Sequence, residues 1–109
     1  MILAKATMRQ PEMNRTEESY AWYLDGLKRA GDILFYKFGL VTLRIGQDCR
    51  YTPDFLVVNK DLAVEFHEVK GFMRDDALVK LKAAAAEYPF IFRLVHKVAG
   101  QWDIKEIRP

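Results

Sequence analysis

The middle of the chain reads YTPDFLVV at residues 51–58 and, four residues later, AVEFHEVKG at residues 63–71. Both runs are rich in Val, Leu and Phe, which is typical of buried strands, and the polar residues between them predict a hairpin turn. Asp54, Glu68 and Lys70 interrupt this apolar pattern, although charged side chains are rarely buried unless they are paired. These three charges are the strongest functional signal in the sequence.

Alternation of side chains along a strand predicts where these charges lie. Glu68 and Lys70 share one face of the second strand, whereas Glu65 and His67 share the other. If the two strands pair through the turn, Asp54 and Glu68 come near the same end of the hairpin. We therefore expect neighbouring carboxylates there, with Glu65 and His67 directed away from them.

Two half-buried carboxylates repel each other, and burial raises their pKa values, so a cation is needed to offset them. Lys70 supplies one positive charge. A divalent ion would supply two, and Mg²⁺ is typically held by one or two carboxylates together with waters and phosphate oxygens. The structural alternative is an ion pair of Lys70 with Asp54 or Glu68, an arrangement that is common and weak on protein surfaces.

Composition sets broad limits on the class of protein. With 109 residues and 50% hydrophobic content, the chain is expected to form one domain. The formal net charge of +2 says little about partners, so a nucleic-acid surface would have to come from local clustering. The single cysteine, Cys49, excludes an intramolecular disulfide and a Cys-rich zinc site. No apolar run approaches the ~20 residues of a membrane span, and we expect a soluble, cytoplasmic protein.

The capping and periodicity signals predict an α/β fold in which a mixed β-sheet is flanked by helices. An N-terminal arm is expected over residues 1–15, followed by a single domain over residues 16–109. Its predicted helices span residues 16–30 and 75–88, and its predicted strands span residues 33–38, 40–45, 50–58, 62–70, 90–95 and 102–107. The helix between the fourth and fifth strands implies a parallel βαβ crossover.

Pro53-Asp54 followed by Glu68-Val69-Lys70 resembles the PD-(D/E)XK motif of the restriction-endonuclease-like nuclease superfamily. The resemblance covers nearly all of the chain after residue 14. With its upstream helix and the later KLKAA segment, the chain is similar to small phage and prophage endonuclease-like proteins. Phage Holliday-junction resolvases of the endonuclease I type are more distant relatives.

This resemblance implies a metal-dependent endodeoxyribonuclease that hydrolyses DNA phosphodiester bonds with Mg²⁺ (or Mn²⁺). Asp54, Glu68 and the carbonyl of Val69 would bind the ion, and Lys70 would assist the attacking water. Many members take a further Glu from the upstream helix. We favour Glu17 over Glu18 for this role, because Glu17 shares a helix face with apolar residues suited to packing on the sheet.

Basic residues around the second helix are the candidates for DNA contacts. Members of the superfamily often place a polar residue of this helix near the scissile phosphate, and Lys80 is the candidate here. Arg74 and Lys82 would each neutralise one backbone phosphate. A solvated helix face is the alternative interpretation of these lysines.

The sequence leaves the substrate open among duplex, branched and junction DNA, so the nuclease is either general or structure-selective. One alternative is a dimeric Holliday-junction resolvase, because symmetric cleavage of a four-way junction needs a homodimer. Another is a catalytically silent nucleic-acid-binding or phage-assembly module with the same fold. If the protein is phage-encoded, the host cytoplasm is its expected location.

Overall fold

The computed structural model describes residues 12–71 and 75–108, which form an α/β fold. Its helices are α2 (Arg15–Ala30) and α3 (Asp75–Glu87). Its strands are β1 (Ile33–Phe38), β2 (Leu43–Gly46), β3 (Cys49–Tyr51), β4 (Phe55–Asn59), β5 (Val64–Lys70), β6 (Ile91–Val98) and β7 (Gln101–Glu106). Most of the predicted N-terminal arm lies outside the described residues. Within those residues, neither helix has the length and apolar character that crossing a membrane requires.

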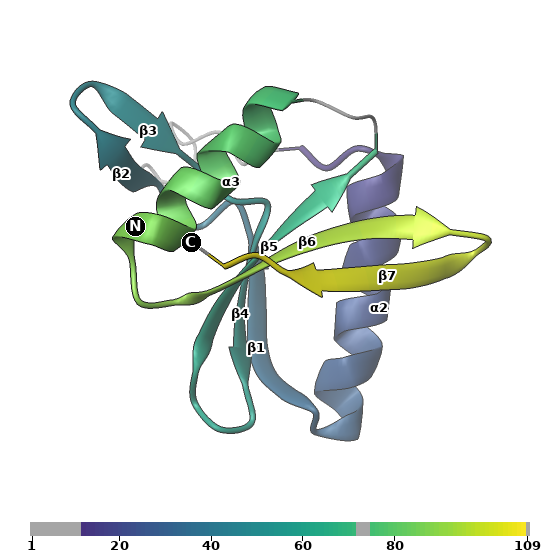
Figure 1. The fold of residues 1–109 in the computed structure, drawn as a ribbon. Coiled ribbons are helices and arrows are strands. Elements are labelled where there is room, and N and C mark those ends of the chain that lie inside the picture. Colours follow the sequence, from purple (N-terminus) through teal and green to yellow (C-terminus); the bar gives the residue numbers. More distant parts are fainter. Residues whose placement is uncertain (1–11, 72–74, 109) are drawn as a thin grey trace, which may run out of the picture.

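Five strands make a mixed sheet in the order β1-β4-β5-β6-β7, and β2 pairs with β3 in a separate two-stranded sheet. β4 runs antiparallel to both β1 and β5, whereas β6 runs parallel to β5. The chain from β5 through α3 to β6 is therefore a βαβ crossover. The predicted α/β class, with a mixed sheet flanked by helices, is confirmed (Figure 1).

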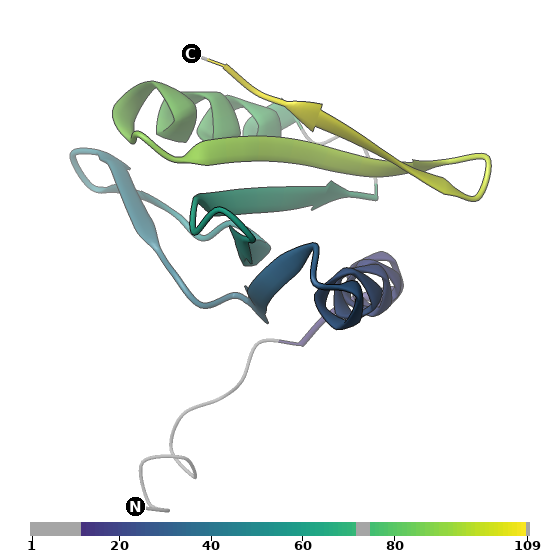
Figure 2. The ribbon, with the colours of Figure 1, turned by 90° about the horizontal axis from the view of Figure 1, so that it is seen from below.

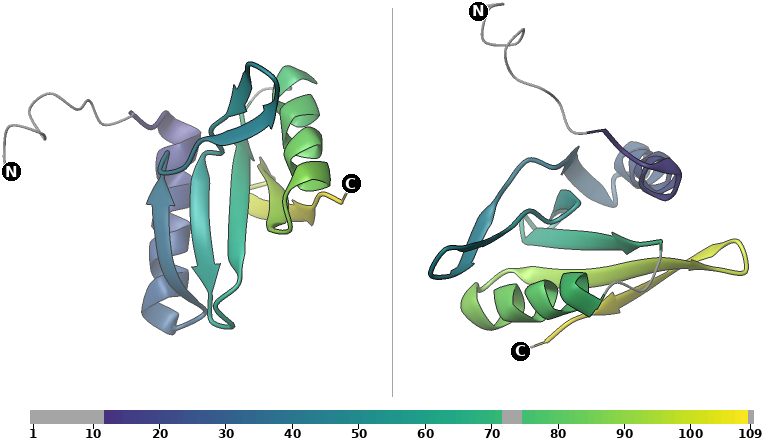
Figure 3. Two further views of the ribbon diagram at one scale, coloured as in Figure 1. Left: turned by 90° about the vertical axis from the view of Figure 1, so that its left-hand side faces the viewer. Right: turned by 90° about the horizontal axis from the view of Figure 1, so that it is seen from above.

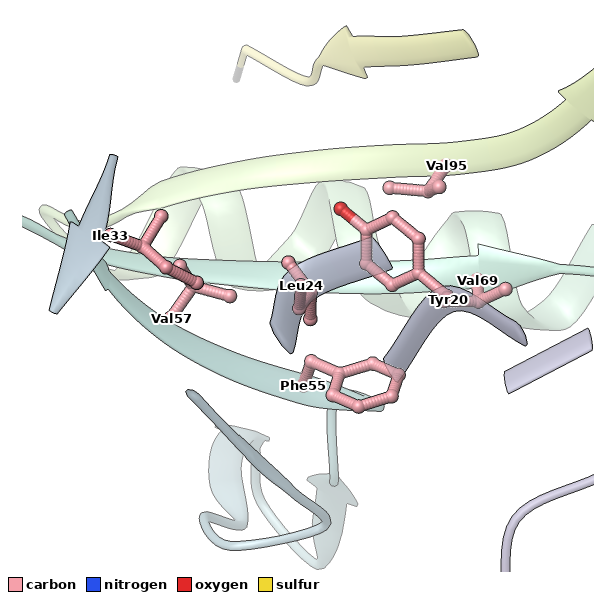
Figure 4. Packing of buried hydrophobic residues seen from close by; sticks show 7 residues of the cluster. All are labelled: Tyr20, Leu24, Ile33, Phe55, Val57, Val69 and Val95. Atoms are coloured by element: carbon pink, nitrogen blue, oxygen red, sulfur yellow. The ribbon is translucent and has the colours of Figure 1, made fainter. Parts of the chain in front are cut away.

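The two helices cover opposite faces of the sheet, as Figures 2 and 3 show from three directions. On one face, Tyr20 and Leu24 of α2 pack against alternate residues of the strands. This cluster consists of Tyr20, Leu24, Ile33, Phe55, Val57, Val69 and Val95 (Figure 4). On the other face, α3 and the β2–β3 hairpin enclose a second cluster, which consists of Leu43, Tyr51, Phe66, Leu81, Ala84, Ala85 and Phe92. Alternation along β5 thus divides its residues between two cores.

The predicted strand over residues 50–58 is wrong, because the structure divides it into β3 and β4. The break falls at Pro53, which is buried and has no N–H to contribute to a strand ladder. The predicted strand over residues 40–45 is likewise shortened to β2, which pairs with β3 outside the main sheet. As a result, Asp54 precedes β4 rather than lying within a continuous strand.

α2 begins and ends at its capping residues. Oδ1 of Asn14 accepts a 2.8 Å hydrogen bond from the N–H of Glu17, and Oε1 of Glu17 accepts one of 2.9 Å from the N–H of Asn14. This reciprocal capping box fixes the first turn. Gly31 ends the helix with φ 84°, in the left-handed region that favours glycine. The helix starts at Arg15, one residue before its predicted start at residue 16.

The hairpin between β4 and β5 is closed by the side chain of Asn59. Its Oδ1 accepts hydrogen bonds from the N–H groups of Asp61 (2.9 Å) and Ala63 (3.1 Å). Leu62 adopts φ 66° in this turn, so β5 begins at Val64, two residues after its predicted start. The last two strands differ from their predicted bounds by only one to three residues.

Candidate active site

A pocket of about 470 Å³ lies between the sheet, the first turn of α2 and the first turns of α3. Its walls carry all four residues that were predicted to be catalytic: Glu17, Asp54, Glu68 and Lys70. Glu17 comes from α2, Asp54 from the segment before β4, and the other two from the end of β5. The fold therefore brings together side chains from three separate parts of the chain.

The pairing of β4 with β5 places the two strand carboxylates beside each other. Phe55 lies opposite His67, so the next residues outward are Asp54 and Glu68. The N–H of Val69 donates a 2.8 Å hydrogen bond to Oδ2 of Asp54, which ties the start of β4 to β5. The register expected from alternation and the hairpin turn is therefore confirmed.

The carboxylates are held where ionisation is unfavourable. Burial and the charge of Glu68 raise the pKa of Asp54 to about 8, the hydrogen bond from Val69 opposes this rise, and Glu17 adds to it. Burial also raises the pKa of Glu68, although hydrogen bonds from Tyr51 and Asp54 oppose that change. Without a bound cation, this cluster retains a proton near neutral pH.

Lys70 does not neutralise the carboxylates by direct pairing. Among the ion pairs formed by the described residues, none joins Lys70 to Asp54 or to Glu68. The structural alternative, an ion pair of Lys70 with Asp54 or Glu68, is therefore not present in the structure. The half-buried side chain of Lys70 lines the pocket beside these carboxylates.

Tyr51 is a site residue that the sequence analysis missed. Its hydroxyl donates a 2.5 Å hydrogen bond to Oε1 of Glu68. Burial, followed by the charge of Glu68, raises the pKa of the Tyr51 hydroxyl, which therefore stays protonated as a donor. No sequence pattern indicates this contact, because it depends on the break at Pro53 and on the folding of β3 toward α3.

Glu17 has both a structural and an electrostatic part in the pocket. Its carboxylate accepts the capping hydrogen bond from Asn14 and also contributes to the raised pKa of Asp54. Glu18, by contrast, lines a different groove together with Trp22. The helix-face prediction that favoured Glu17 over Glu18 agrees with these positions.

Of the residues predicted to contact DNA, Lys80 and Lys82 do not line this pocket. Its α3 wall is formed by Ala77 and Leu78. Lys80 is half-buried elsewhere on α3, and Lys82 is exposed. Arg74 lies outside the described residues. Lys80 follows Ala77 by one helical turn, so its predicted place at the border of the site remains a prediction.

The opposite face of β5 carries a buried polar network that accounts for Glu65 and His67. Nδ1 of His67 lies 2.6 Å from the hydroxyl of Tyr20, and Nε2 lies 2.8 Å from Oε1 of Glu65. Glu65 also accepts hydrogen bonds of 2.9 Å from Nδ2 of Asn59 and from Nε of Arg93. Both residues thus face away from the pocket, as alternation predicted.

The chemistry of these partners fixes the proton on His67. Glu65 can only accept, because hydrogen bonds from His67, Asn59 and Arg93 outweigh burial and lower its pKa to about 2. Nε2 of His67 therefore carries the proton, and Nδ1 accepts from Tyr20, whose pKa is raised by burial. Burial lowers the pKa of His67 and keeps its ring neutral. The network is a satisfied structural link between α2 and the sheet.

The donor atoms of the pocket suit a hard divalent cation. Asp54 and Glu68 offer carboxylate oxygens, and Val69 beside them offers a backbone carbonyl. Mg²⁺ prefers oxygen ligands and usually needs only one or two carboxylates. In the part of the chain that the structure describes, no cluster of three or more His, Cys, Asp or Glu side chains has the arrangement of a metal site. An ion here would therefore also take water or substrate oxygens as ligands.

The interpretation of the protein's function depends on the geometry of this pocket. Comparison of the chain with family models, curated proteins and solved structures finds no match.

Proposed function

We propose that this protein is a metal-dependent endodeoxyribonuclease of the PD-(D/E)XK type, which hydrolyses DNA phosphodiester bonds in the pocket of Asp54, Glu68 and Lys70. One observation supports the proposal most directly. Two carboxylates with raised pKa values, one just before β4 and one on β5, lie next to a lysine that pairs with neither of them. Such charges oppose folding, and strongly perturbed groups gathered in a pocket are typical of catalytic sites.

Asp54, Glu68 and the carbonyl of Val69 would hold Mg²⁺ (or Mn²⁺), and Glu17 would bind a second ion or a water around the first. When bound, such an ion polarises a phosphoryl oxygen and lowers the pKa of water. The residues of the chain hold this site in shape. The N–H of Val69 fixes Asp54, and the hydroxyl of Tyr51 fixes Glu68.

Lys70 has the remaining chemical role. Its ammonium group would orient the attacking water by a hydrogen bond and offset the negative charge that develops on the phosphoryl oxygens. A lysine already paired with a carboxylate would stabilise these phosphoryl oxygens poorly, because the carboxylate would neutralise most of its charge. The absence of a Lys70 pair with Asp54 or Glu68 therefore supports this role.

The test is cleavage of labelled linear duplex, single-stranded, flapped and four-way-junction DNA by the purified protein with Mg²⁺ or Mn²⁺. Wild type should cleave at least one of these substrates, and chelation should stop it. Asp54→Asn, Glu68→Gln and Lys70→Ala should each reduce the rate by at least about a hundredfold, as loss of groups that act on the transition state does. Glu18→Gln, an exposed charge outside the pocket, is the matched control.

The substrate panel also separates the alternatives. Symmetric cleavage confined to the four-way junction, by a dimer in solution, would identify a resolvase. Binding of DNA without cleavage under any metal condition would replace the nuclease by a silent binding module. Wild-type rates in any one of the three pocket variants would remove that residue from the mechanism.

A further inference from the structure

A second pocket of about 280 Å³ adjoins the carboxylate pocket. It is lined by Arg15, Thr16, Ser19, Lys70, Gly71 and Lys97. Four of these residues, Arg15, Thr16, Lys70 and Gly71, also line the first pocket, so the two share a wall. Lys70 therefore stands between a pocket with three carboxylates and a pocket with none.

The second pocket concentrates positive charge in a chain whose net charge is only +2. Its three charged side chains are all cations, and its two hydroxyls are hydrogen-bond donors as well. Among the ion pairs formed by the side chains of residues 12–71 and 77–108, none involves Arg15, Lys70 or Lys97. The carboxylates of these residues therefore do not neutralise the three cations.

Lys97 is held in this position by contacts from two directions. Its Nζ lies 3.4 Å from Oγ of Ser19 and 5.3 Å from the centre of the Trp102 ring. The cation–π contact restrains a side chain that would otherwise move freely at the end of β6. The pocket also lies at the first turn of α2, where the positive end of the helix dipole favours an anion.

We infer that this cationic pocket binds a backbone phosphate of the nucleic-acid strand, next to the phosphate that is cleaved. The inference rests on the proposed function, because it places the substrate strand across both pockets. Lys70, at the shared wall, would then contact the strand between the two phosphates. Arg15 and Lys97 would contact the DNA backbone beside the site.

The test is equilibrium binding, measured by the fluorescence anisotropy of a labelled duplex oligonucleotide in EDTA at pH 7. Arg15→Gln and Lys97→Gln are compared with wild type over a series of salt concentrations. Each should weaken binding several-fold and lower the slope of log K against log salt concentration by about 0.9, the value for one lost phosphate contact on duplex DNA. The double variant should lower the slope by about twice that amount.

Lys28→Gln is the matched control, because Lys28 is an exposed cation in the last turn of the same helix. The helical rise places Lys28 about 20 Å from Arg15 along α2. This variant should bind DNA with the affinity and salt slope of wild type. Thermal melts of all variants within a few degrees of wild type would show that binding changes do not come from unfolding.

The outcomes for binding and for cleavage are separate. If the Arg15 and Lys97 variants keep the wild-type affinity and salt slope, the phosphate pocket is overturned, even when wild type cleaves DNA with Mg²⁺. If wild type cleaves nothing but both variants lose affinity as expected, the pocket stands and the nuclease proposal falls. Failure of wild type to bind DNA at all would overturn the inference by itself.

Discussion

The N–H of Val69 and the carboxylate of Asp54 are joined by a hydrogen bond of 2.8 Å across the two strands that meet at the pocket. The bond favours the ionised form of Asp54, yet burial and the charge of Glu68 outweigh it. The backbone thus fixes the carboxylate in a place where its charge is unfavourable. Measurements of folding stability should therefore report on the charge of Asp54.

Asp54→Asn should raise the melting temperature of the metal-free protein at pH 8.5. The amide oxygen can still accept from Val69, while the repulsion with Glu68 disappears. A gain of 1 kcal/mol in unfolding free energy would raise Tm by about 4–8 °C for a domain of nearly this size. The measurement is a thermal melt of both proteins in EDTA, and a lower Tm in the variant would contradict the prediction.

The same two proteins should respond differently to metal. An ion that binds only the folded protein adds about 2.7 kcal/mol of stability at a hundredfold excess over its Kd. Excess Mn²⁺ should therefore raise the Tm of wild type and have little effect on Asp54→Asn. Equal shifts in the two proteins would mean that Asp54 does not hold the ion.

The metal-free stability of wild type should fall relative to Asp54→Asn as the pH rises. The pKa of Asp54 is about 8 in the folded protein and about 3.9 in an unfolded chain, so the folded state holds the extra proton between these values. The loss of stability caused by ionising Asp54 is absent below about pH 4 and complete above about pH 8. Urea unfolding in EDTA at pH 5 and pH 8.5 should show the difference between the proteins growing with pH.

His67 changes folding stability with pH in the direction opposite to Asp54, so the two contributions must be separated. Its folded pKa is lowered, so the unfolded state takes up its proton first and stability falls as the pH drops below about 6.5. Because both proteins contain His67, its contribution cancels in their difference. A difference between wild type and Asp54→Asn that is constant from pH 5 to pH 8.5 would contradict the raised pKa of Asp54.

Much of the site could be predicted because it depends on local rules. Strand alternation and one short turn are enough to bring Asp54 and Glu68 together, and helix periodicity is enough to favour Glu17 over Glu18. The same alternation directs Glu65 and His67 to the other face. Each of these steps involves residues that are close in sequence or joined by one regular pairing, so errors at strand ends do not change the result.

The parts that could not be predicted depend on contacts between distant segments. Lys97 and Ser19 meet across 78 positions of sequence, and the cationic pocket exists only because they do. The contact of Tyr51 with Glu68 needs the break at Pro53, which the apolar pattern of the run conceals. The rotation of α3 about its axis is likewise set by its packing against β6 and the β2–β3 hairpin, which the sequence of the helix does not specify.

Glu65→Gln and Glu68→Gln should separate a structural carboxylate from a functional one. Glutamine at position 65 would direct an amide donor at Asn59 or at Arg93, and a buried donor without an acceptor costs about 1–3 kcal/mol. Glu65→Gln should therefore lower Tm but keep the rise on adding Mn²⁺. Glu68→Gln should lose that rise without a comparable loss of stability. Thermal melts of both variants with EDTA and with excess Mn²⁺ test this difference. If Glu65→Gln lost the Mn²⁺-induced rise and Glu68→Gln kept it, the metal would lie on the other face of β5.

Tyr51→Phe should move the pH dependence of cleavage. The hydrogen bond from Tyr51 lowers the pKa of Glu68, so its loss leaves that carboxylate protonated up to a higher pH. We expect kcat/KM at pH 7 to fall by about tenfold, the effect of losing one hydrogen bond to a charged group. Activity should recover at higher pH. A uniform loss at every pH would show that Tyr51 acts only through packing.

Glu17→Gln should reduce cleavage by about tenfold or more at saturating Mg²⁺, and Glu18→Gln should leave it near wild type. Glutamine at position 17 can still accept the capping hydrogen bond from Asn14, because Gln serves in a capping box as Glu does. The substitution therefore removes the negative charge beside Asp54 while it preserves the start of α2.

Circular dichroism should show unchanged helix content in both variants, and their Tm values in Mg²⁺ should lie within a few degrees of each other. With the fold held constant in this way, a difference in rate reports the charge in the pocket. Equal rates in the two variants would show that Glu17 caps the helix and has no part in the chemistry.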